Sequence, residues 1–418
     1  MVAVPVSDED PIRILVLTDT FVPEISALSF RTLEHARVWL ARGHEVTVVT
    51  CAPNWPRGKL FEGYRNKLHQ VEWIEGVRVI RLWTYMAANR GVIKRTLDYM
   101  SFTFSAAAQC WRIPDFDVIL ASSPTFFTAV AGFLISILRR RAWVFEIRDL
   151  WPASIRAVRA SQSRVLDMVE KLELYLYRKA DRIISVTHSI KMNLVSRGIE
   201  AGKIDVVPNA VDTGKFHPSR ATFNARTVLG VPRNAFLAGY VGTTGMAHGL
   251  ETILDAAERC KELPDIHFLI MGDGAERDAL EESARLRRLG NLTFKDVVPH
   301  DQIPSYYAAL DLSIVHLRPD PVFKTVIPSK IFEVMAMGVP ILMAVEGESA
   351  EIIRESGSGV CIPSGDAEAM AQSVIGLSKD RAALEAMGRR GIAAAGERYS
   401  RDRMAEAALT CLKAAVEA

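Results

Sequence analysis

Lys330 and Glu333 are the two residues of this chain whose types and spacing point most clearly to chemistry. The sequence predicts a short helix around them, because Pro328 suits its first position and Gly338 suits its end. Side chains three residues apart share one helix face, and the free N–H groups at a helix start favour phosphate. Because Lys330 adds a positive charge and Glu333 can accept hydrogen bonds from two ribose hydroxyls, the pair indicates a nucleotide diphosphate site. An ordinary surface ion pair is the alternative.

A second element that can bind an anion is expected in the same half of the chain. An apolar run at 237–241 leads into a glycine-rich segment, 242–249, and then into a helix from Leu250. Glycines let backbone N–H groups approach a phosphate closely, although a plain tight turn is the alternative. After a later strand, Asp273 is expected either to contact a ligand hydroxyl or to cap the helix that begins near Glu276.

Near-continuous apolar runs alternate with helical segments along the chain, as in proteins built on parallel sheets. Residues 208–218 interrupt this pattern with two prolines and a glycine, which indicates a linker. The sequence therefore predicts an α/β fold of two doubly wound, Rossmann-like domains that face a central cleft, with ligands beyond the carboxyl ends of the strands. The expected strands are 12–18, 46–50, 77–82, 118–121, 144–147, 183–186 and 204–207 in the first half and 237–241, 266–271, 292–295, 312–315 and 341–343 in the second.

The predicted boundaries are 1–208 for an N-terminal domain, 209–395 for a C-terminal domain, and 396–418 for a final helix that packs back towards the first domain. Residues 1–208 hold 28 Lys and Arg against 21 Asp and Glu, a net charge of +7, whereas residues 209–418 hold 23 against 28, a net charge of −5. Unless this asymmetry is chance, it indicates that the first domain meets an anionic partner, such as a membrane surface or a phosphorylated acceptor. Nucleic acid is not expected, because no zinc-finger spacing, RNP-like string or basic helix occurs.

Other classes of site are disfavoured by simple patterns. The five cysteines are scattered without a CxxC pair, which indicates reduced thiols in the cytoplasm, and residues 1–10 lack the apolar core of a signal peptide. The most apolar run, 125–138, is too short to span a bilayer, so we expect a buried helix or, because three arginines follow, one that touches a membrane. The Asp-x-Asp string at 115–117 precedes a strand instead of following one, and we interpret it as a turn and not a metal site.

The motifs together resemble those of retaining GT-B glycosyltransferases of family four. The second half is similar to the donor domain of that family, and the first half is similar to its acceptor domain, so the resemblance covers nearly the whole chain. The first half looks like the branch that adds N-acetylated deoxyhexoses, such as N-acetylfucosamine, in bacterial O-antigen and capsule assembly. The segments that carry the resemblance include VGTTGMAHGLETILDA (241–256), MGDGAERDALEESA (271–284), PSKIFEVMAMGVPI (328–341), RTLDYMSF (95–102) and FEIRDLWPASI (145–155).

The resemblance implies roles for particular residues. Glu333 matches the second acid of the family's E-x7-E motif, and Thr325 stands where the first acid is usual. Thr243 and His248 stand in place of the family's basic pair. The residues expected to contact the donor are Gly245, His248, Thr243, Asp273, Thr325, Ser329, Lys330 and Glu333; those expected at the reaction centre are Arg148, Asp149 and Lys324; those expected to contact the acceptor are Arg31, Asn54 and Arg95.

The expected activity follows from the same resemblance. It implies retaining transfer of a sugar, of the N-acetylated deoxyhexose type, from a UDP-linked donor to a sugar on a polyprenyl diphosphate in surface polysaccharide synthesis. No metal or other cofactor is expected, since basic residues and helix starts would hold the diphosphate. The protein is expected in the cytoplasm, bound peripherally at the inner face of the cell membrane, with 94–104 as one membrane-contacting segment. A nucleotide-sugar epimerase of the same fold and a non-catalytic nucleotide-sugar-binding protein are the alternatives.

Overall fold

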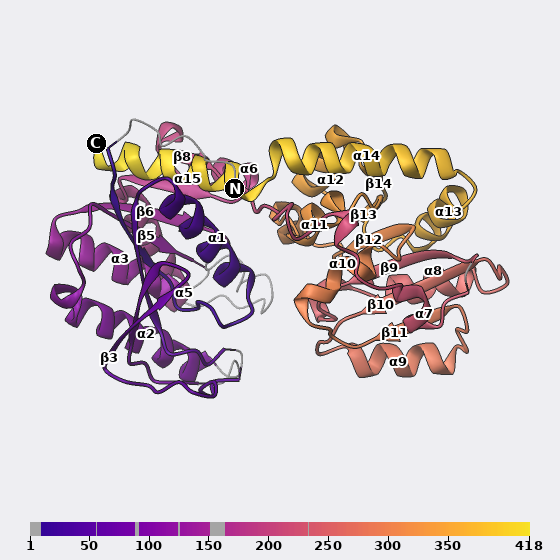
Figure 1. The fold of residues 1–418 in the computed structure, drawn as a ribbon, viewed down its shortest axis with the longest axis horizontal. Helices are drawn as coiled ribbons and strands as arrows, with labels where there is room; N and C mark the ends of the chain where they lie inside the picture. Colours follow the sequence, from indigo (N-terminus) through magenta and orange to yellow (C-terminus); the bar gives the residue numbers. More distant parts are fainter. Residues whose placement is uncertain (1–9, 56, 88–91, 124–125, 151–163, 233) are drawn as a thin grey trace. The chain divides into compact units, whose positions relative to one another are not determined.

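The computed structural model describes residues 10–418 except 56, 88–91, 124–125, 151–163 and 233. The chain divides into two compact units, of which the first comprises Met1–Pro208 with Arg401–Ala418 and the second comprises Asn209–Ser400. The first boundary coincides with the predicted one, and the second lies five residues later than predicted. Each unit has helices on both faces of a sheet that is parallel except for one edge strand of the first unit, so the two predicted Rossmann-like domains are confirmed (Figure 1).

The first unit is built on eight described strands in the order β3-β4-β2-β1-β5-β6-β7-β8. All neighbouring pairs are parallel except β3 and β4, which form an antiparallel edge hairpin across Glu75 and Gly76. The sequence analysis missed β3, because its side chains alternate in exposure at the sheet edge and it lacks an apolar run. The strands are β1 (Arg13–Leu17), β2 (Glu45–Cys51), β3 (His69–Ile74), β4 (Val77–Leu82), β5 (Val118–Ser122), β6 (Ala142–Ile147), β7 (Arg182–Ser185) and β8 (Ile204–Val206).

Helices cover both faces of this first sheet. One face packs against α2 (Val92–Ala108), α3 (Phe126–Arg139), α5 (Arg164–Lys179) and α6 (His188–Ser196) in one apolar cluster. The helices α1 (Ala27–Ala41) and α15 (Arg401–Val416) contact each other and the strands of the same sheet. The indole N–H of Trp39 donates to the carbonyl of Ala405 at 2.8 Å, which ties the final helix to the first unit.

The second unit has six described strands, all parallel, in the order β11-β10-β9-β12-β13-β14. Apolar side chains fill both faces, one against α10, α11, α12 and α14 and the other against α8, α9 and α13. The strands are β9 (Phe236–Val241), β10 (Ile266–Met271), β11 (Leu292–Lys295), β12 (Leu312–His316), β13 (Ile341–Ala344) and β14 (Gly359–Cys361). The helices are α7 (Ala225–Leu229), α8 (Glu251–Arg259), α9 (Arg277–Leu286), α10 (Ile303–Tyr307), α11 (Lys330–Ala336), α12 (Glu348–Ser356), α13 (Ala367–Leu377) and α14 (Arg381–Arg398).

The strand order of each sheet marks where ligands are expected. Chain order reverses between β1 and β5 in the first unit and between β9 and β12 in the second. In open parallel sheets, ligands bind beyond the carboxyl ends of the strands at such reversal points. The loops that follow these strands are therefore the places to look for a site.

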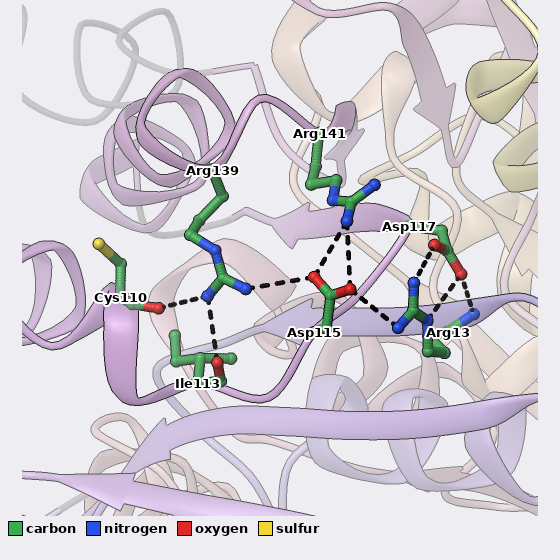
Figure 2. A network of polar contacts seen from close by, with 7 residues as sticks. All are labelled: Arg13, Cys110, Ile113, Asp115, Asp117, Arg139 and Arg141. Atoms are coloured by element: carbon green, nitrogen blue, oxygen red, sulfur yellow. Dashed lines mark hydrogen bonds and ion pairs between the residues drawn. The ribbon is translucent and has the colours of Figure 1, made fainter.

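The Asp-x-Asp string at 115–117 has a structural role, as Figure 2 shows. The Arg13 guanidinium donates to Asp117 at 2.7 Å and to Asp115 at 2.9 Å, and Arg141 donates to Asp115 at 3.0 Å. The hydrogen bond from Arg13 holds the pKa of Asp117 below its usual range. The two carboxylates thus join the start of β1 to the loop before β5. This agrees with the interpretation of 115–117 as a connection that precedes a strand.

Among the described residues, no group of three or more His, Cys, Asp or Glu is placed to hold a metal ion. No helix within the described ranges is long and apolar enough to cross a membrane. Of the apolar run at 125–138, residues 126–138 lie in the helix α3; one side of this helix is buried as expected, and the other side is exposed.

Candidate functional site

Lys330 lies at the first position of α11, directly after Ser329, so the helix starts two residues later than Pro328. Its ammonium nitrogen is shielded from solvent and has no hydrogen-bond partner among the described residues. It lies 3.9 Å from the centre of the Tyr240 ring, a cation–π contact. Burial lowers the pKa of Lys330 to about 7. A buried ammonium without a hydrogen-bond partner is costly, which makes Lys330 a candidate for contact with an anionic ligand.

Glu333 lies one turn further along α11 and contacts Tyr307 of α10. The Tyr307 hydroxyl donates to Glu333 Oε2 at 3.4 Å, and burial raises the pKa of Glu333 to about 7. Among the described residues, Glu333 and Lys330 form no ion pair with each other within 4 Å, so the surface ion-pair alternative is wrong. The pair instead offers one positive and one hydrogen-bond-accepting group.

The loops after β9 and β10 pack against each other beside Lys330. A Cβ atom at Gly272 would lie 1.8 Å from the carbonyl oxygen of Gly242, and one at Gly242 would lie 2.4 Å from the Lys330 nitrogen. The Thr244 N–H donates to the carbonyl of Asp273 at 3.0 Å, which joins the two loops. The glycines are therefore required by close packing, which makes room for the Lys330 side chain at the reversal point between β9 and β12.

The residues of the β9 loop supply few charges. Tyr240 donates its hydroxyl to the Thr243 carbonyl at 2.7 Å, and the Thr243 side chain is exposed. His248 has Nδ1 3.2 Å from the Gly245 carbonyl. Burial, followed by the positive charge of Lys330, lowers the pKa of His248 to about 4. His248 is therefore neutral at pH 7, whereas Lys330, with a pKa of about 7, carries part of a positive charge beside this loop.

Three other predicted site residues of the second unit, Asp273, Lys324 and Thr325, lie in loops before helices. The Asp273 carboxylate accepts the N–H of Gly274 at 2.7 Å, and α9 has Glu276 at its N-cap position, so the prediction that Asp273 caps this helix is wrong. Lys324 forms an ion pair with Glu346 at 2.5 Å. Lys324 and Thr325 lie in a short 3-10 turn, Pro321–Thr325, before α11. A cavity of about 170 Å³ adjoins this turn and is lined by Arg318, Pro319, Asp320, Pro321, Phe323, Lys324, Val345, Glu346 and Ser364.

A larger cavity of about 310 Å³ lies in the first unit and brings together four predicted residues. Asn54 follows β2, Arg95 lies on α2, and Arg148 and Asp149 follow β6. The remaining lining residues are Asp19, Thr20, Glu24, Ser26, Ala27, Leu28, Cys51, Trp55, Thr84, Ala87, Asp98, Tyr99 and Phe102. The cavity is thus built by the loops at the carboxyl ends of β1, β2, β4 and β6, as the strand order predicts.

Glu24 organises the loops of this cavity. Its carboxylate accepts the N–H groups of Phe21 at 3.0 Å, Asn54 at 2.9 Å and Trp55 at 2.8 Å. Burial raises the pKa of Glu24, and these three hydrogen bonds oppose that rise. Ser26 caps α1 through the N–H of Ser29 at 3.0 Å. Glu24 therefore fixes the loop after β1 to the loop after β2.

Arg31 does not line the cavity, and its contacts do not support the predicted acceptor role. Its guanidinium donates to Glu146 at 2.9 Å and to the carbonyls of Val207 and Pro208 at 2.9 and 2.7 Å. Every nitrogen of the group is thereby used inside the first unit. Arg31 is a structural residue that holds α1 to β6 and to the end of β8.

Arg148 and Asp149 end β6 at the cavity wall. The Arg148 N–H donates to the Ser123 hydroxyl at 2.9 Å, and burial lowers the pKa of the Arg148 guanidinium to about 10, with Glu146 opposing that change. The alternative that Asp149 caps a helix at Trp151 concerns a segment outside the described residues. The sequence analysis did not identify Tyr240, Tyr307 or Asp98 as site residues, because they belong to ordinary buried strand and helix patterns.

Comparison with known proteins supports one class of activity. The model of the glycosyl transferase 4-like domain matches residues 27–210, and that of glycosyl transferases group 1 matches residues 235–380. Over 379 residues the chain is 26% identical to a provisionally assigned colanic acid biosynthesis glycosyl transferase, WcaI, of Escherichia coli (strain K12), covering 87% of this chain and 91% of the relative. It is 25% identical over 272 residues to the lipopolysaccharide core biosynthesis glycosyltransferase LpsE of Rhizobium meliloti (strain 1021), covering 65% and 74%.

Solved structures show the same fold over nearly the whole chain. Sucrose-phosphate synthase from Thermosynechococcus elongatus matches with a TM-score of 0.74 at 19% identity, covering 96% of this chain and 98% of that one. Anabaena Alr3699/HepE, in complex with UDP and glucose, matches with a TM-score of 0.70 at 19% identity, covering 96% and 99%. The likeness in fold extends over both units.

Proposed function

We propose that this chain, which is a glycosyltransferase with the GT-B fold, moves a sugar with retention from a UDP-linked donor to a lipid-diphosphate-linked sugar in surface polysaccharide synthesis. The observation that carries the donor assignment is the buried Lys330 ammonium, which has no hydrogen-bond partner within the described part of the chain. The relatives named for colanic acid and lipopolysaccharide synthesis support the pathway class. The HepE structure with UDP and glucose supports the choice of nucleotide.

Different groups of the second unit would contact different parts of the donor. Lys330 lies where a diphosphate would replace its contact with the Tyr240 ring, and this charge would stabilise the departing UDP. Glu333, held by Tyr307, would accept the two ribose hydroxyls. Thr325 replaces a carboxylate of the family motif, which suits a donor sugar with fewer hydroxyls, such as an N-acetylated deoxyhexose. No protein nucleophile is assigned, and we propose that the reaction needs no metal.

The test is turnover with a panel of UDP-, GDP- and dTDP-sugars, with and without a polyprenyl-diphosphate sugar. We expect UDP release that requires the acceptor, persists in EDTA and gives a product whose anomeric configuration by NMR matches the donor. A free epimer formed without acceptor would assign the epimerase alternative, and binding without turnover would assign the binding protein. Transfer with an inverted linkage would refute retention alone.

We further propose that the outer side of α2, α3 and α5 contacts an anionic membrane surface. These helices are neighbours in the first unit, and each exposes large apolar side chains, among them Phe104 (73% exposed), Ile137 (56%) and Met168 (71%). Exposed cations accompany them, namely Lys94, Arg95, Arg140, Lys171, Arg178 and Lys179. Apolar residues with flanking cations suit the boundary between lipid headgroups and acyl chains. Because α2 also lines the larger cavity, a lipid-linked acceptor would arrive beside it.

The membrane contact predicts that flotation depends on lipid charge and on these apolar residues. With liposomes that contain anionic lipid, the wild type should float, and the double variant Phe104→Ser and Ile137→Ser should float several-fold less. Val228→Ser is the matched control, because Val228 is equally exposed (56%) but lies in the second unit. Equal flotation on neutral and anionic liposomes, or no loss in the double variant, would refute the contact.

A further inference from the structure

We propose that the 310 Å³ cavity of the first unit accepts a sugar that carries no negative charge and rejects uronic acids and phosphorylated sugars. The inference rests on the proposed function, since it specifies the acceptor class for the same reaction. The cavity is lined by the carboxylates of Asp19, Glu24, Asp98 and Asp149 and by the guanidinium groups of Arg95 and Arg148. Four acids against two bases give the cavity a net charge of −2 when all are ionised. The proposed acceptor is already linked to an anionic diphosphate, so a further negative charge on its sugar would be unfavourable here.

The two guanidinium groups of the cavity already have neighbours within the first unit. Arg95 donates one hydrogen bond to the Tyr99 hydroxyl at 3.0 Å and lies 5.6 Å from the centre of the same ring, so only part of its guanidinium is occupied. The Arg148 guanidinium is buried beside Glu146, whose charge is the main favourable influence on its pKa. An anionic sugar would therefore meet a net negative charge, because the two guanidinium groups offset only half of the four carboxylates.

Asp98 shows the potential inside the cavity most directly. Its Oδ2 accepts the N–H of Ala87 at 3.2 Å, and no hydrogen bond is made by Oδ1 among the described residues. Burial raises the pKa of Asp98 to about 6; the hydrogen bond from Ala87 and the positive charge of Arg95 oppose that rise, and the charges of Asp19 and Glu24 add to it. A second anion beside this group would be repelled in the same way. A sugar hydroxyl, in contrast, would donate a charge-assisted hydrogen bond to Oδ1.

A second, independent observation points to a hydroxylated ligand. Thr84 lines the cavity and is 1% exposed, yet its hydroxyl oxygen is buried without a hydrogen-bond partner among the described residues. The backbone of Thr84 is held by Asn66, whose side chain donates to its carbonyl at 2.7 Å and accepts its N–H at 3.2 Å. Buried hydroxyls are normally paired, so an unpaired one in a cavity wall is suited to a polar ligand. The exposed indole of Trp55 adds an apolar face of the kind on which a sugar ring stacks.

Direct binding of soluble glycosides to the intact chain tests this inference without donor or lipid. Dissociation constants for methyl glucoside and methyl galactoside, by saturation-transfer NMR at pH 7.5, are compared with those for the matching methyl glucuronide and methyl galacturonide. We expect saturable binding of at least one neutral glycoside and at least tenfold weaker binding of its uronate. The variant Asp98→Asn should reduce that ratio at least threefold, because it removes one negative charge and keeps an oxygen to accept the Ala87 N–H.

The matched control is Asp402→Asn, which makes the same change at an exposed position on α15 of the same unit. It should leave the ratio unchanged, and thermal melts of both variants should confirm that they fold. Uronate binding as tight as that of the neutral glycoside, or a ratio that Asp98→Asn does not alter, would overturn the inference even if UDP-dependent transfer is observed. If the protein binds neutral glycosides more tightly than uronates but shows no UDP-dependent transfer, the proposed function is refuted and this inference is not.

Discussion

Lys330→Met should weaken UDP binding by about 10- to 150-fold, because a charge-assisted contact to the diphosphate is worth about 1.5–3 kcal/mol. Methionine keeps most of the apolar length that packs on the Tyr240 ring and removes only the ammonium. Isothermal titration with UDP measures the change. Lys379→Met, at an exposed position between α13 and α14, is the control and should bind UDP as the wild type does.

Lys330→Met also tests whether Lys330 binds UDP or stabilises the fold. A buried ammonium without a hydrogen-bond partner destabilises the empty protein, so Lys330→Met should unfold at the same temperature as the wild type or higher. Loss of UDP affinity together with retained stability would support the donor site. An unchanged dissociation constant for UDP, or a large loss of stability without any loss of affinity, would exclude Lys330 from the site.

Arg31→Ala should destabilise the protein by about 3–5 kcal/mol, the usual cost of removing one partner from a buried ion pair. Arg31 and Glu146 are only 7% and 5% exposed at their side chains, and they are 2.9 Å apart. Burial by itself would raise the pKa of Glu146, but the positive charges of Arg31 and Arg148 lower that pKa to about 2. Without Arg31, that carboxylate stays buried with less compensation, and two backbone carbonyls lose their donor.

Urea denaturation measures this loss, and Arg37→Ala is the control on the same helix. Arg37 pairs with Glu75 at an exposed position, where an ion pair contributes about 0–1 kcal/mol. Adding Glu146→Ala to Arg31→Ala should recover part of the stability, since the uncompensated charge is then removed. If Arg31→Ala were as stable as the wild type but raised the KM for the acceptor, the original acceptor assignment would be right and the structural one wrong.

Several parts of the fold were predictable because they depend on local pattern. The apolar runs became the parallel strands of both sheets, since a strand buried on two faces must be apolar along its length. β3 was not predictable by that criterion, because an edge strand needs no such run. The sequence analysis placed the second boundary five residues too early, because α14 (Arg381–Arg398) and α15 (Arg401–Val416) follow each other closely along the chain, and the contacts of α15 with α1 and with β5, β6 and β7 assign it to the first unit.

In the candidate site, too, the residues set by local pattern were predictable and those set by distant contacts were not. The spacing of Lys330 and Glu333 predicted that both lie on α11, so residue type and local geometry were enough for this pair. The glycines of the β9 loop were expected to approach a phosphate, and the structure shows that Gly242 packs against Gly272 and Lys330. Arg31 has the right chemistry for an anion, but its role depends on Glu146, which is 115 residues away in the chain.

The sequence by itself determined the two α/β domains and the Lys330–Glu333 pair, because these depend on periodicity and on spacing within one element, and its motifs indicated the glycosyltransferase class by their resemblance to a known family. Only the tertiary structure decided which cations remain available to a ligand. In the folded chain, Arg31 and Arg13 form ion pairs with the carboxylates of Glu146 and Asp117. The Lys330 ammonium has no hydrogen-bond partner among the described residues. Four carboxylates from distant parts of the chain line the first-unit cavity. The physical reason is that the availability of a charge is set by its neighbours in space, which come from distant parts of the chain.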